Sequence, residues 1–264
     1  MPEETQMAIP QALVSAVRDQ RAVLFAGAGL SYGTLKVGGL ELRDAIGAKI
    51  AEDYPKYDIT SRSVEDVCDE YVAINDYKGL VNALAEAIPQ NAPPSRGHLA
   101  AVRSFRFIVT TNWDLLFEAA YSQIGQGRQI LASEDDVPNF NYDQHNLLKI
   151  HGTVDRPLTL VATTDDYEGY ADTHAGLLGK VGELLTNNTV LFVGYGLRDE
   201  HVRRLLATIR RRGGRWTQRA YAVGFYDEVR TKLLASRGID VLPYDAHDFL
   251  DELANRAAAV TSAV

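Results

Sequence analysis

The chain has 264 residues, of which 46% are hydrophobic, and its formal net charge is −8. This composition supports one sizeable core, and the negative charge disfavours binding to nucleic acids or anionic membranes, because both need a positive field. A single cysteine, Cys68, excludes an internal disulfide framework and a multi-cysteine zinc site, and its setting predicts a buried helix residue.

Six short apolar runs, each ending in glycine or a polar cluster, alternate with helical patterns such as 199–212 and 227–236. The runs cover residues 21–27, 105–111, 146–152, 189–194, 219–224 and 239–244. Nearly continuous apolar runs of this length are typical of strands buried on both faces, as in parallel sheets. The alternation predicts a Rossmann-like, doubly wound α/β fold with a mostly parallel sheet.

One stretch interrupts this alternation. Residues 52–100 contain no strand pattern, but helical patterns cover 63–74 and 76–88, and a proline-rich break follows at 89–94. We therefore expect a single domain over 1–264 that carries a helical insertion at approximately 52–100.

The segment Gly27, Ala28, Gly29, Leu30, Ser31 follows the first run directly. Such glycines allow a tight turn and close approach to a pyrophosphate, which free amides at a helix start would bind, and Ser31 adds a hydroxyl. A plain strand-to-helix turn is the alternative. An ordinary dehydrogenase fingerprint also needs a third glycine and an acidic residue after a second strand, and this sequence lacks that arrangement.

Unusual polar or glycine residues follow three further runs. They are Thr111, Asn112 and Asp114 after the second, His151 after the third, and Gly194, Tyr195 and Gly196 after the fourth. Because ligands of doubly wound sheets bind at the carboxyl ends of the strands, these residues should face one crevice. For Asn112 and Asp114, capping of a helix at 113–122 is an alternative or additional role. For His151, the alternative is capping of a turn.

Four motifs, in this order, resemble those of the sirtuin-like family of NAD⁺-consuming proteins. They are Gly-Ala-Gly-Leu-Ser at 27–31, Thr-Thr-Asn-Trp-Asp at 110–114, Lys-Ile-His-Gly at 149–152 and Gly-Tyr-Gly-Leu-Arg-Asp at 194–199. The resemblance implies that NAD⁺ binds along these strand ends. It assigns Gly27, Ala28, Gly29 and Ser31 to the pyrophosphate, Asn112 and Asp114 to the nicotinamide ribose, His151 to the general base, and Gly194, Tyr195 and Gly196 to the adenosine ribose. Thr111 completes the expected NAD⁺-binding set.

These residue types suit cleavage of the bond between nicotinamide and ribose. Nicotinamide is a cationic leaving group, so the barrier lies mainly in the oxocarbenium character that develops on the ribose. The Asn112 amide can orient a ribose hydroxyl or the attacking water, and His151 can take a proton near neutral pH. Asp114 can orient Asn112 or its loop.

The sequence also departs from the sirtuin deacylases, which carry a four-cysteine zinc module and a Pro-Asp-Phe-Arg segment after the phosphate loop. Residues 32–44 lack that segment, and Cys68 is the only cysteine. Without an acyl-lysine site, water becomes the expected acceptor. The reduced pattern resembles NAD⁺-depleting hydrolases of bacterial antiphage defence, which give ADP-ribose and nicotinamide. The alternatives are an NAD⁺-dependent deacylase or ADP-ribosyltransferase, and a non-catalytic module that senses NAD⁺ or ADP-ribose.

A toxic NAD⁺ hydrolase must be held inactive in healthy cells. We therefore expect low basal activity and a homo-oligomer, a regulatory partner protein, or both. The basic residues between 203 and 215 fit a solvated helix end, with a partner contact as the alternative, and direct nucleic-acid binding is not favoured. The histidines show no metal-ligand spacing, so no metal is expected. Residues 1–10 lack signal-peptide features and no stretch approaches the roughly 20 apolar residues of a membrane span, so we expect a cytoplasmic protein.

Overall fold

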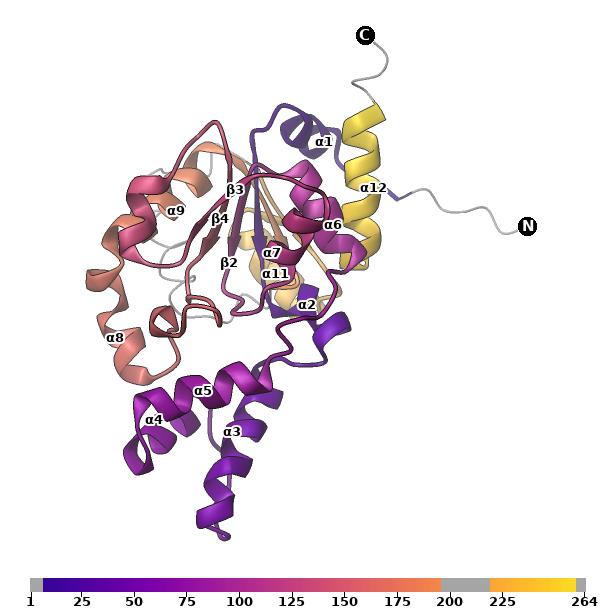
Figure 1. Ribbon diagram of the computed structural model, residues 1–264. Helices are drawn as coiled ribbons and strands as arrows, with labels where there is room; N and C mark the ends of the chain where they lie inside the picture. The colour runs from indigo at the N-terminus through magenta and orange to yellow at the C-terminus, as the bar shows by residue number, and fades with distance from the viewer. Residues whose placement is uncertain (1–6, 196–218, 260–264) are drawn as a thin grey trace.

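The computed structural model describes residues 7–195 and 219–259 (Figure 1). Its centre is one seven-stranded sheet in which every described pairing is parallel, with the order β3-β4-β2-β1-β5-β6-β7. The strands are β1 (Ala22–Ala26), β2 (Phe107–Thr110), β3 (Arg128–Leu131), β4 (His145–Lys149), β5 (Thr189–Val193), β6 (Ala220–Val223) and β7 (Ile239–Leu242). The chain winds to one side of β1 and then, from β5, to the other, so the sheet is doubly wound about β1.

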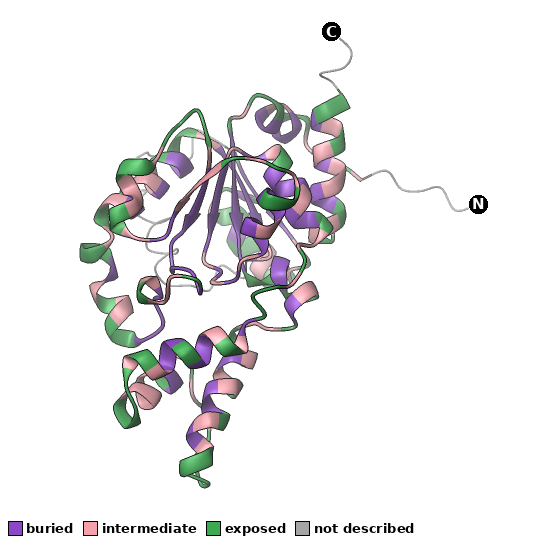
Figure 2. Ribbon diagram, viewed as in Figure 1, coloured by how far each residue is buried: buried purple, intermediate pink, exposed green. Residues whose placement is uncertain are grey.

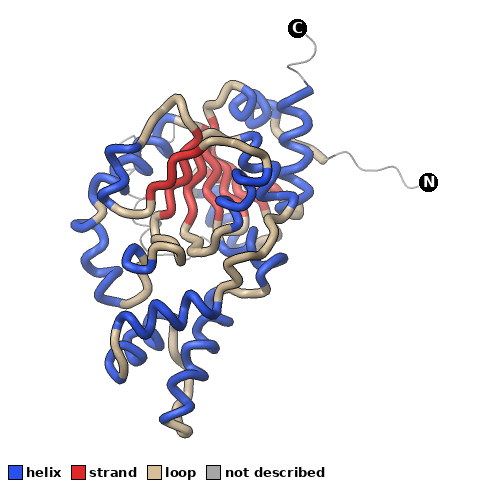
Figure 3. Tube along the Cα trace, viewed as in Figure 1, coloured by secondary structure: helices blue, strands red, loops and turns tan. Residues whose placement is uncertain are grey.

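Helices cover both faces of the sheet (Figure 3). On one face pack α1 (Gln11–Arg18), α6 (Arg96–Ser104), α7 (Leu116–Gln123) and α12 (Ala246–Ala259). On the other pack α8 (Thr164–Thr173), α9 (Ala175–Asn187) and α11 (Glu228–Ser236). The short helix α2 (Ala28–Leu35) follows β1, and the 3₁₀ helices η1 (Glu134–Asn139) and η2 (Pro157–Thr159) lie in connections around β4.

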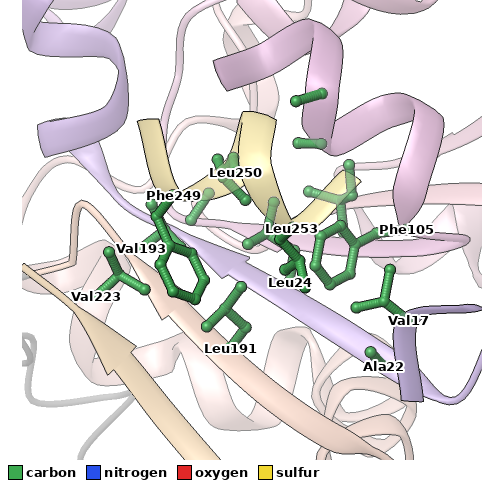
Figure 4. Packing of buried hydrophobic residues seen from close by; sticks show 14 of the residues in the cluster. Val17, Ala22, Leu24, Phe105, Leu191, Val193, Val223, Phe249, Leu250 and Leu253 are labelled. Atoms are coloured by element: carbon green, nitrogen blue, oxygen red, sulfur yellow. The ribbon is translucent and has the colours of Figure 1, made fainter. Parts of the chain in front are cut away.

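Alternate residues of the central strands build the two cores. In β1, Leu24 packs toward α1, α6 and α12, whereas Val23 and Phe25 pack toward α9 and α11. Figure 4 shows the first core, where Leu24 and Leu191 lie under Phe249 and Leu253 of α12. Because both faces are covered, the central strands are buried along their whole length (Figure 2), which explains their nearly continuous apolar sequences.

Three helices form a separate layer beside the carboxyl ends of the strands (Figure 1). They are α3 (Gly39–Asp53), α4 (Val64–Ile74) and α5 (Tyr77–Ala87), and they share a core that includes Ile46, Cys68 and Leu84. The hydroxyl of Ser63 accepts from the Asp66 amide at the start of α4, and the carboxylate of Asp76 accepts from the Gly79 amide at the start of α5. We refer to α3, α4 and α5 as the helical module, and we propose that it begins at α3, ahead of the expected boundary at 52.

The predicted α/β fold is confirmed, and all six predicted strands are present. The sequence reading missed β3, whose four residues begin with Arg128 and Gln129 and lie at the sheet edge, where only Leu131 is buried. The helix predicted at 113–122 begins later, at Leu116. The predicted helical segment at 199–212 lies outside the described residues.

Candidate active site

A cavity of about 190 Å³ lies between the carboxyl ends of the strands and the helical module. The start of α2 and the loops that follow β2 and β4 supply one side of it, which includes Ala28, Ser31, Thr111, Asn112, Asp114 and His151. The opposite side carries Val37, Leu42, Val64, Glu65 and Ile88. Segments far apart in the sequence therefore meet at one cavity, and the sheet and the helical module build it together.

Four of the other predicted site residues do not line this cavity, and a fifth lies outside the described residues. Gly27, Gly29, Gly194 and Tyr195 are not part of the described lining, and Gly196 lies outside the described residues. The structure thus brings Asn112, Asp114 and His151 together with Ala28, Ser31 and Thr111, whereas Gly27, Gly29 and Gly194 contact one another outside the cavity lining.

Asn112 follows β2 and is held by two hydrogen bonds. Its backbone N–H donates to the Thr110 hydroxyl at 3.0 Å, and its Nδ2 donates to the Ser31 Oγ at 3.0 Å. The residue is only 7% exposed, and its Oδ1 is buried with no hydrogen-bond partner among the described residues. A buried amide oxygen left without a partner is costly, so Oδ1 is an acceptor available to a ligand.

His151 follows β4 and is 4% exposed. Its backbone carbonyl accepts from the Val161 amide at 3.1 Å, its Nδ1 lies 3.5 Å from the Tyr167 hydroxyl, and its ring packs edge-on against Tyr167 and Tyr170. The Tyr170 hydroxyl in turn donates to the carbonyl of Ile150. These contacts hold the imidazole at the cavity wall.

Asp114 has a structural role that the sequence reading left open. Its Oδ1 accepts from the Leu116 amide at 3.0 Å, at the first turn of α7. The carboxylate thus satisfies the first amide of α7, although the N-cap position is Leu115, and Asp114 also lines the cavity. Its predicted role at the nicotinamide ribose stays a prediction.

The glycines after β1 serve contacts within the protein. The N–H of Gly27 donates to the Val193 carbonyl at 3.0 Å, and the N–H of Gly29 donates to the Gly194 carbonyl at 2.8 Å. A Cβ at either glycine would lie within 2.8 Å of the Gly194 oxygen. Glycine is therefore needed where the turns after β1 and β5 touch. The predicted contact of this loop with a pyrophosphate stays a prediction, and Ala28 is the loop residue that faces the cavity.

A buried ion pair that sequence reasoning missed joins the last residue of β4 to α7. Lys149 is 1% exposed, and its Nζ donates to the Asp114 carbonyl at 2.5 Å, to Glu118 Oε1 at 2.7 Å and to the Thr153 hydroxyl at 2.9 Å. Burial raises the pKa of Glu118, although the Lys149 ammonium opposes that shift. The available signal was a lysine placed directly between Leu148 and Ile150 in a buried run.

The second feature that sequence reasoning missed is a buried contact between Ser31, the partner of Asn112, and His98. The Ser31 hydroxyl contacts the Nε2 of His98 at 3.4 Å, and His98 is completely buried in α6. A single histidine without ligand spacing gives no sequence signal of this kind, because its partners come from other elements.

Within the described ranges, no cluster of three or more His, Cys, Asp or Glu side chains is arranged to hold a metal ion. Among the helices in the same ranges, none has both the length and the apolar character needed to cross a bilayer.

Comparisons with known proteins place these features in a family. A profile described as SIR2-like domain matches residues 106–242, about half of the chain. The NAD(+) hydrolase ThsA of Enterococcus faecium is 28% identical over 243 residues, which are 90% of this chain and 48% of that protein. The NAD(+) hydrolase ThsA of Bacillus cereus is 24% identical over 210 residues, 78% of this chain and 44% of that protein. Defense-associated sirtuin 2 of Bacillus subtilis is 29% identical over 107 residues, 39% of this chain and 10% of that protein.

The chain therefore spans about half the length, or less, of the curated relatives it matches. The fold has a solved counterpart in a structure described as "Structural Basis for the Mechanism and Regulation of Sir2 Enzymes", with a TM-score of 0.56 at 15% identity. That alignment covers 96% of this chain and 100% of the solved one. By the profile match and the shared fold, this chain belongs to the SIR2-like domain family.

Proposed function

We propose that this chain hydrolyses the nicotinamide–ribose bond of NAD⁺, so that NAD⁺ and water give ADP-ribose, nicotinamide and a proton. The observation that carries the proposal is that Asn112 and His151 line one cavity, in which Asn112 presents a buried acceptor oxygen that has no partner among the described residues. The names of the ThsA relatives, each called an NAD(+) hydrolase, support the same reaction.

In this proposal the polar side chains bind and activate the reactants, and the apolar side chains exclude water. Nicotinamide leaves as a neutral molecule, so positive charge develops on the ribose in the transition state. Asn112 Oδ1 accepts a hydrogen bond from a ribose hydroxyl or the attacking water, and His151 takes the proton that hydrolysis releases. Ala28, Ser31 and Thr111 bind the remainder of the substrate. Apolar side chains such as Leu42 and Ile88 exclude bulk water from the reacting ribose.

We further propose that the reaction serves NAD⁺ depletion in bacterial antiphage defence, in the cytoplasm. The name of the defense-associated relative supports this role. Low basal activity follows from the need to protect uninfected cells, with control through a homo-oligomer, a regulatory partner protein, or both. Light scattering combined with activity measured across protein concentrations tests this. Full activity in a dilute, strictly monomeric sample would contradict it.

The decisive experiment incubates the purified protein with NAD⁺ and separates the products by chromatography. Free ADP-ribose and nicotinamide are expected from the wild type, and Asn112→Ala or His151→Ala should each slow turnover by at least ~100-fold. His145→Ala is the matched control, because His145 lies at the opposite end of the same strand β4 and should leave the rate unchanged.

The same assay distinguishes the alternative functions. Release of acyl-ADP-ribose that depends on an added acyl-lysine peptide would indicate deacylation, and label transferred from NAD⁺ to protein would indicate ADP-ribosylation. Tight binding of NAD⁺ without turnover, unaffected by His151→Ala, would indicate a sensing module and would refute hydrolysis.

A further inference from the structure

A continuous series of polar side chains runs from the cavity to the edge of α12. The Asn112 Nδ2 donates to Ser31 Oγ at 3.0 Å, and Ser31 Oγ lies 3.4 Å from the Nε2 of His98. On the far side of the imidazole, His98 Nδ1 lies 2.7 Å from Ser95 Oγ, which lies 3.2 Å from the Nδ1 of His247. We refer to Asn112, Ser31, His98, Ser95 and His247 as the polar relay.

Packing leaves little freedom to the middle of the polar relay. Ser31 and His98 are 1% and 0% exposed, and the His98 ring packs edge-on against Phe117 at a centroid distance of 4.8 Å. A Cβ at Gly97 would lie 2.5 Å from the Nδ1 of His247, so glycine at this position gives His247 the room to reach Ser95. Each member comes from a different place in the fold except Ser95 and His98, which share the start of α6.

The donor and acceptor rules give the polar relay two arrangements in which the Ser31 proton is donated to another member. In the first, Asn112 Nδ2 donates to Ser31, Ser31 donates to His98 Nε2, and the protonated Nδ1 of His98 donates to Ser95. In the second, His98 carries its proton on Nε2 and donates to Ser31, which then donates to Asn112 Oδ1. A hydroxyl has a single proton, and a neutral imidazole has one donor and one acceptor nitrogen. The Nδ1–H tautomer of His98 therefore commits the Ser31 proton to Nε2 and leaves Ser31 only as an acceptor for Asn112, whereas the Nε2–H tautomer leaves that proton free for Asn112 Oδ1.

The two arrangements present opposite ends of the Asn112 amide to the cavity. The first leaves Oδ1 facing the ligand as an acceptor, and the second leaves the NH₂ group there as a donor. The structure has the Asn112 orientation of the first arrangement, since Nδ2 bonds to Ser31 and Oδ1 has no partner among the described residues. An acceptor is the end that binds a ribose hydroxyl or an attacking water.

We propose that His98 is a positioning residue whose Nδ1–H tautomer, acting through Ser31, holds the Asn112 amide with Oδ1 toward the cavity. The catalytic consequence of this arrangement rests on the proposed NAD⁺ hydrolysis, whereas the tautomer itself does not. Burial lowers the pKa of His98 to about 4, against an opposing effect of Asp114, so the ring is neutral at pH 7 and has a defined tautomer to select.

Nitrogen NMR on the full chain labelled with ¹⁵N-histidine tests the tautomer directly. At pH 7.5 the signals of His98, identified by their loss in His98→Gln, should show a protonated Nδ1 and an unprotonated Nε2. A protonated Nε2, or an even mixture of tautomers, would overturn the proposal. This measurement needs no activity, so it decides the polar relay even if the protein does not cleave NAD⁺.

Steady-state kinetics test the consequence for catalysis. His98→Phe removes both ring contacts, and because a misplaced catalytic group can cost up to ~100-fold, kcat should fall at least ~10-fold while KM changes less than about threefold. His98→Gln can still accept from Ser31 and should recover most of the loss. Val102→Ala, at another fully buried position of α6, is the control for destabilisation and should keep the wild-type kcat.

The outcomes separate the two proposals. An unchanged kcat in His98→Phe, or an equal loss in Val102→Ala, refutes the positioning role. A wild type that never cleaves NAD⁺, together with the expected tautomer, refutes the proposed reaction and leaves the held amide established. If His98→Phe does not fold, the tautomer measured by nitrogen NMR decides the question, because that measurement needs only the wild type and His98→Gln.

Discussion

At the scale of single residues, the motifs around the cavity owe much of their composition to contacts within the protein. Gly152 has a φ of +81°, and a Cβ there would lie 2.0 Å from the Thr159 carbonyl oxygen. Gly194 has a φ of +61°, and a Cβ there would lie 2.2 Å from the Leu30 amide nitrogen. The first glycine turns the chain directly after His151, and the second lets the turn after β5 reach the loop after β1.

We predict that Gly152→Ala destabilises the protein far more than Gly125→Ala. Gly125 has a similar φ of +66° but nothing within 4 Å of its missing side chain. Gly125→Ala should therefore cost only the left-handed strain, roughly 1 kcal/mol, while Gly152→Ala adds a clash with backbone and should cost several times as much. Urea unfolding of both variants measures the difference. Equal losses would contradict the structural role of Gly152.

Lys149 should be the most sensitive charged residue near the site. Lys149→Met leaves Glu118 buried without its cation and frees the Asp114 carbonyl, so the free energy of unfolding should fall by roughly 3–5 kcal/mol. Glu118→Gln in the same chain removes the stranded carboxylate and should restore part of the loss. A double-mutant cycle by urea unfolding checks this. Additive losses would show that the pair does not interact.

At the scale of elements, the helical module supplies the apolar half of the cavity. Leu42 of α3 and Val64 of α4 line the cavity, and both helices pack around the same core as α5. The module rests on Val154, Leu160 and Ala162, which follow β4. Its position is therefore coupled to the loop that carries His151, and any movement of the module changes the cavity.

Cys68 offers a direct test of how firmly this module is packed. The thiol is completely buried in α4, and burial raises its pKa to about 12, so the native protein should react with a thiol reagent at a negligible rate. Ile46→Ala, which removes a buried neighbour in the same core, should speed labelling by loosening the module. Rapid labelling of the native wild type would contradict this packing.

At the scale of the whole molecule, the double winding about β1 creates the site. β1 pairs with both β2 and β5, so the loops after these strands meet at one edge of the sheet. The helices α6 and α12 then close the face behind β1, which places His98 beside Ser31 and His247 beside Ser95. The cavity and the polar relay behind it are both consequences of this topology.

The burial of His98 predicts a pH dependence of global stability. Its pKa is lowered from 6.5 to about 4 in the folded protein, mainly by burial, with Asp114 raising it and His247 lowering it further. Between these values the unfolded chain binds the additional proton. The free energy of unfolding should thus decrease as the pH falls from about 6.5 toward 4, by on the order of 3 kcal/mol from this group.

Comparison of the wild type with His98→Phe isolates that contribution. The variant lacks the titrating group, so its stability should change less between pH 7 and pH 5, whereas other groups contribute equally to both proteins. Urea unfolding midpoints at the two pH values provide the measurement. Identical pH slopes would show that His98 is not the group responsible.

Local sequence patterns determined which segments form most of the strands and two helices of the module. The strands from β1 to β7, except β3, and the helices α4 and α5 are readable because burial on both faces demands continuous apolar runs, and because Ser63 and Asp76 supply helix caps at known offsets. The residues after each strand end are likewise visible, since parallel strands must place those ends at one edge.

Only the tertiary structure decided which groups act on one another at that edge. Ser31 contacts Asn112 and His98, Lys149 of β4 binds Glu118 of α7, and the helical module completes the cavity through partners that are distant in sequence. No local periodicity encodes such pairings. They depend on the spatial order of the strands in the sheet and on the distances between side chains that this order imposes.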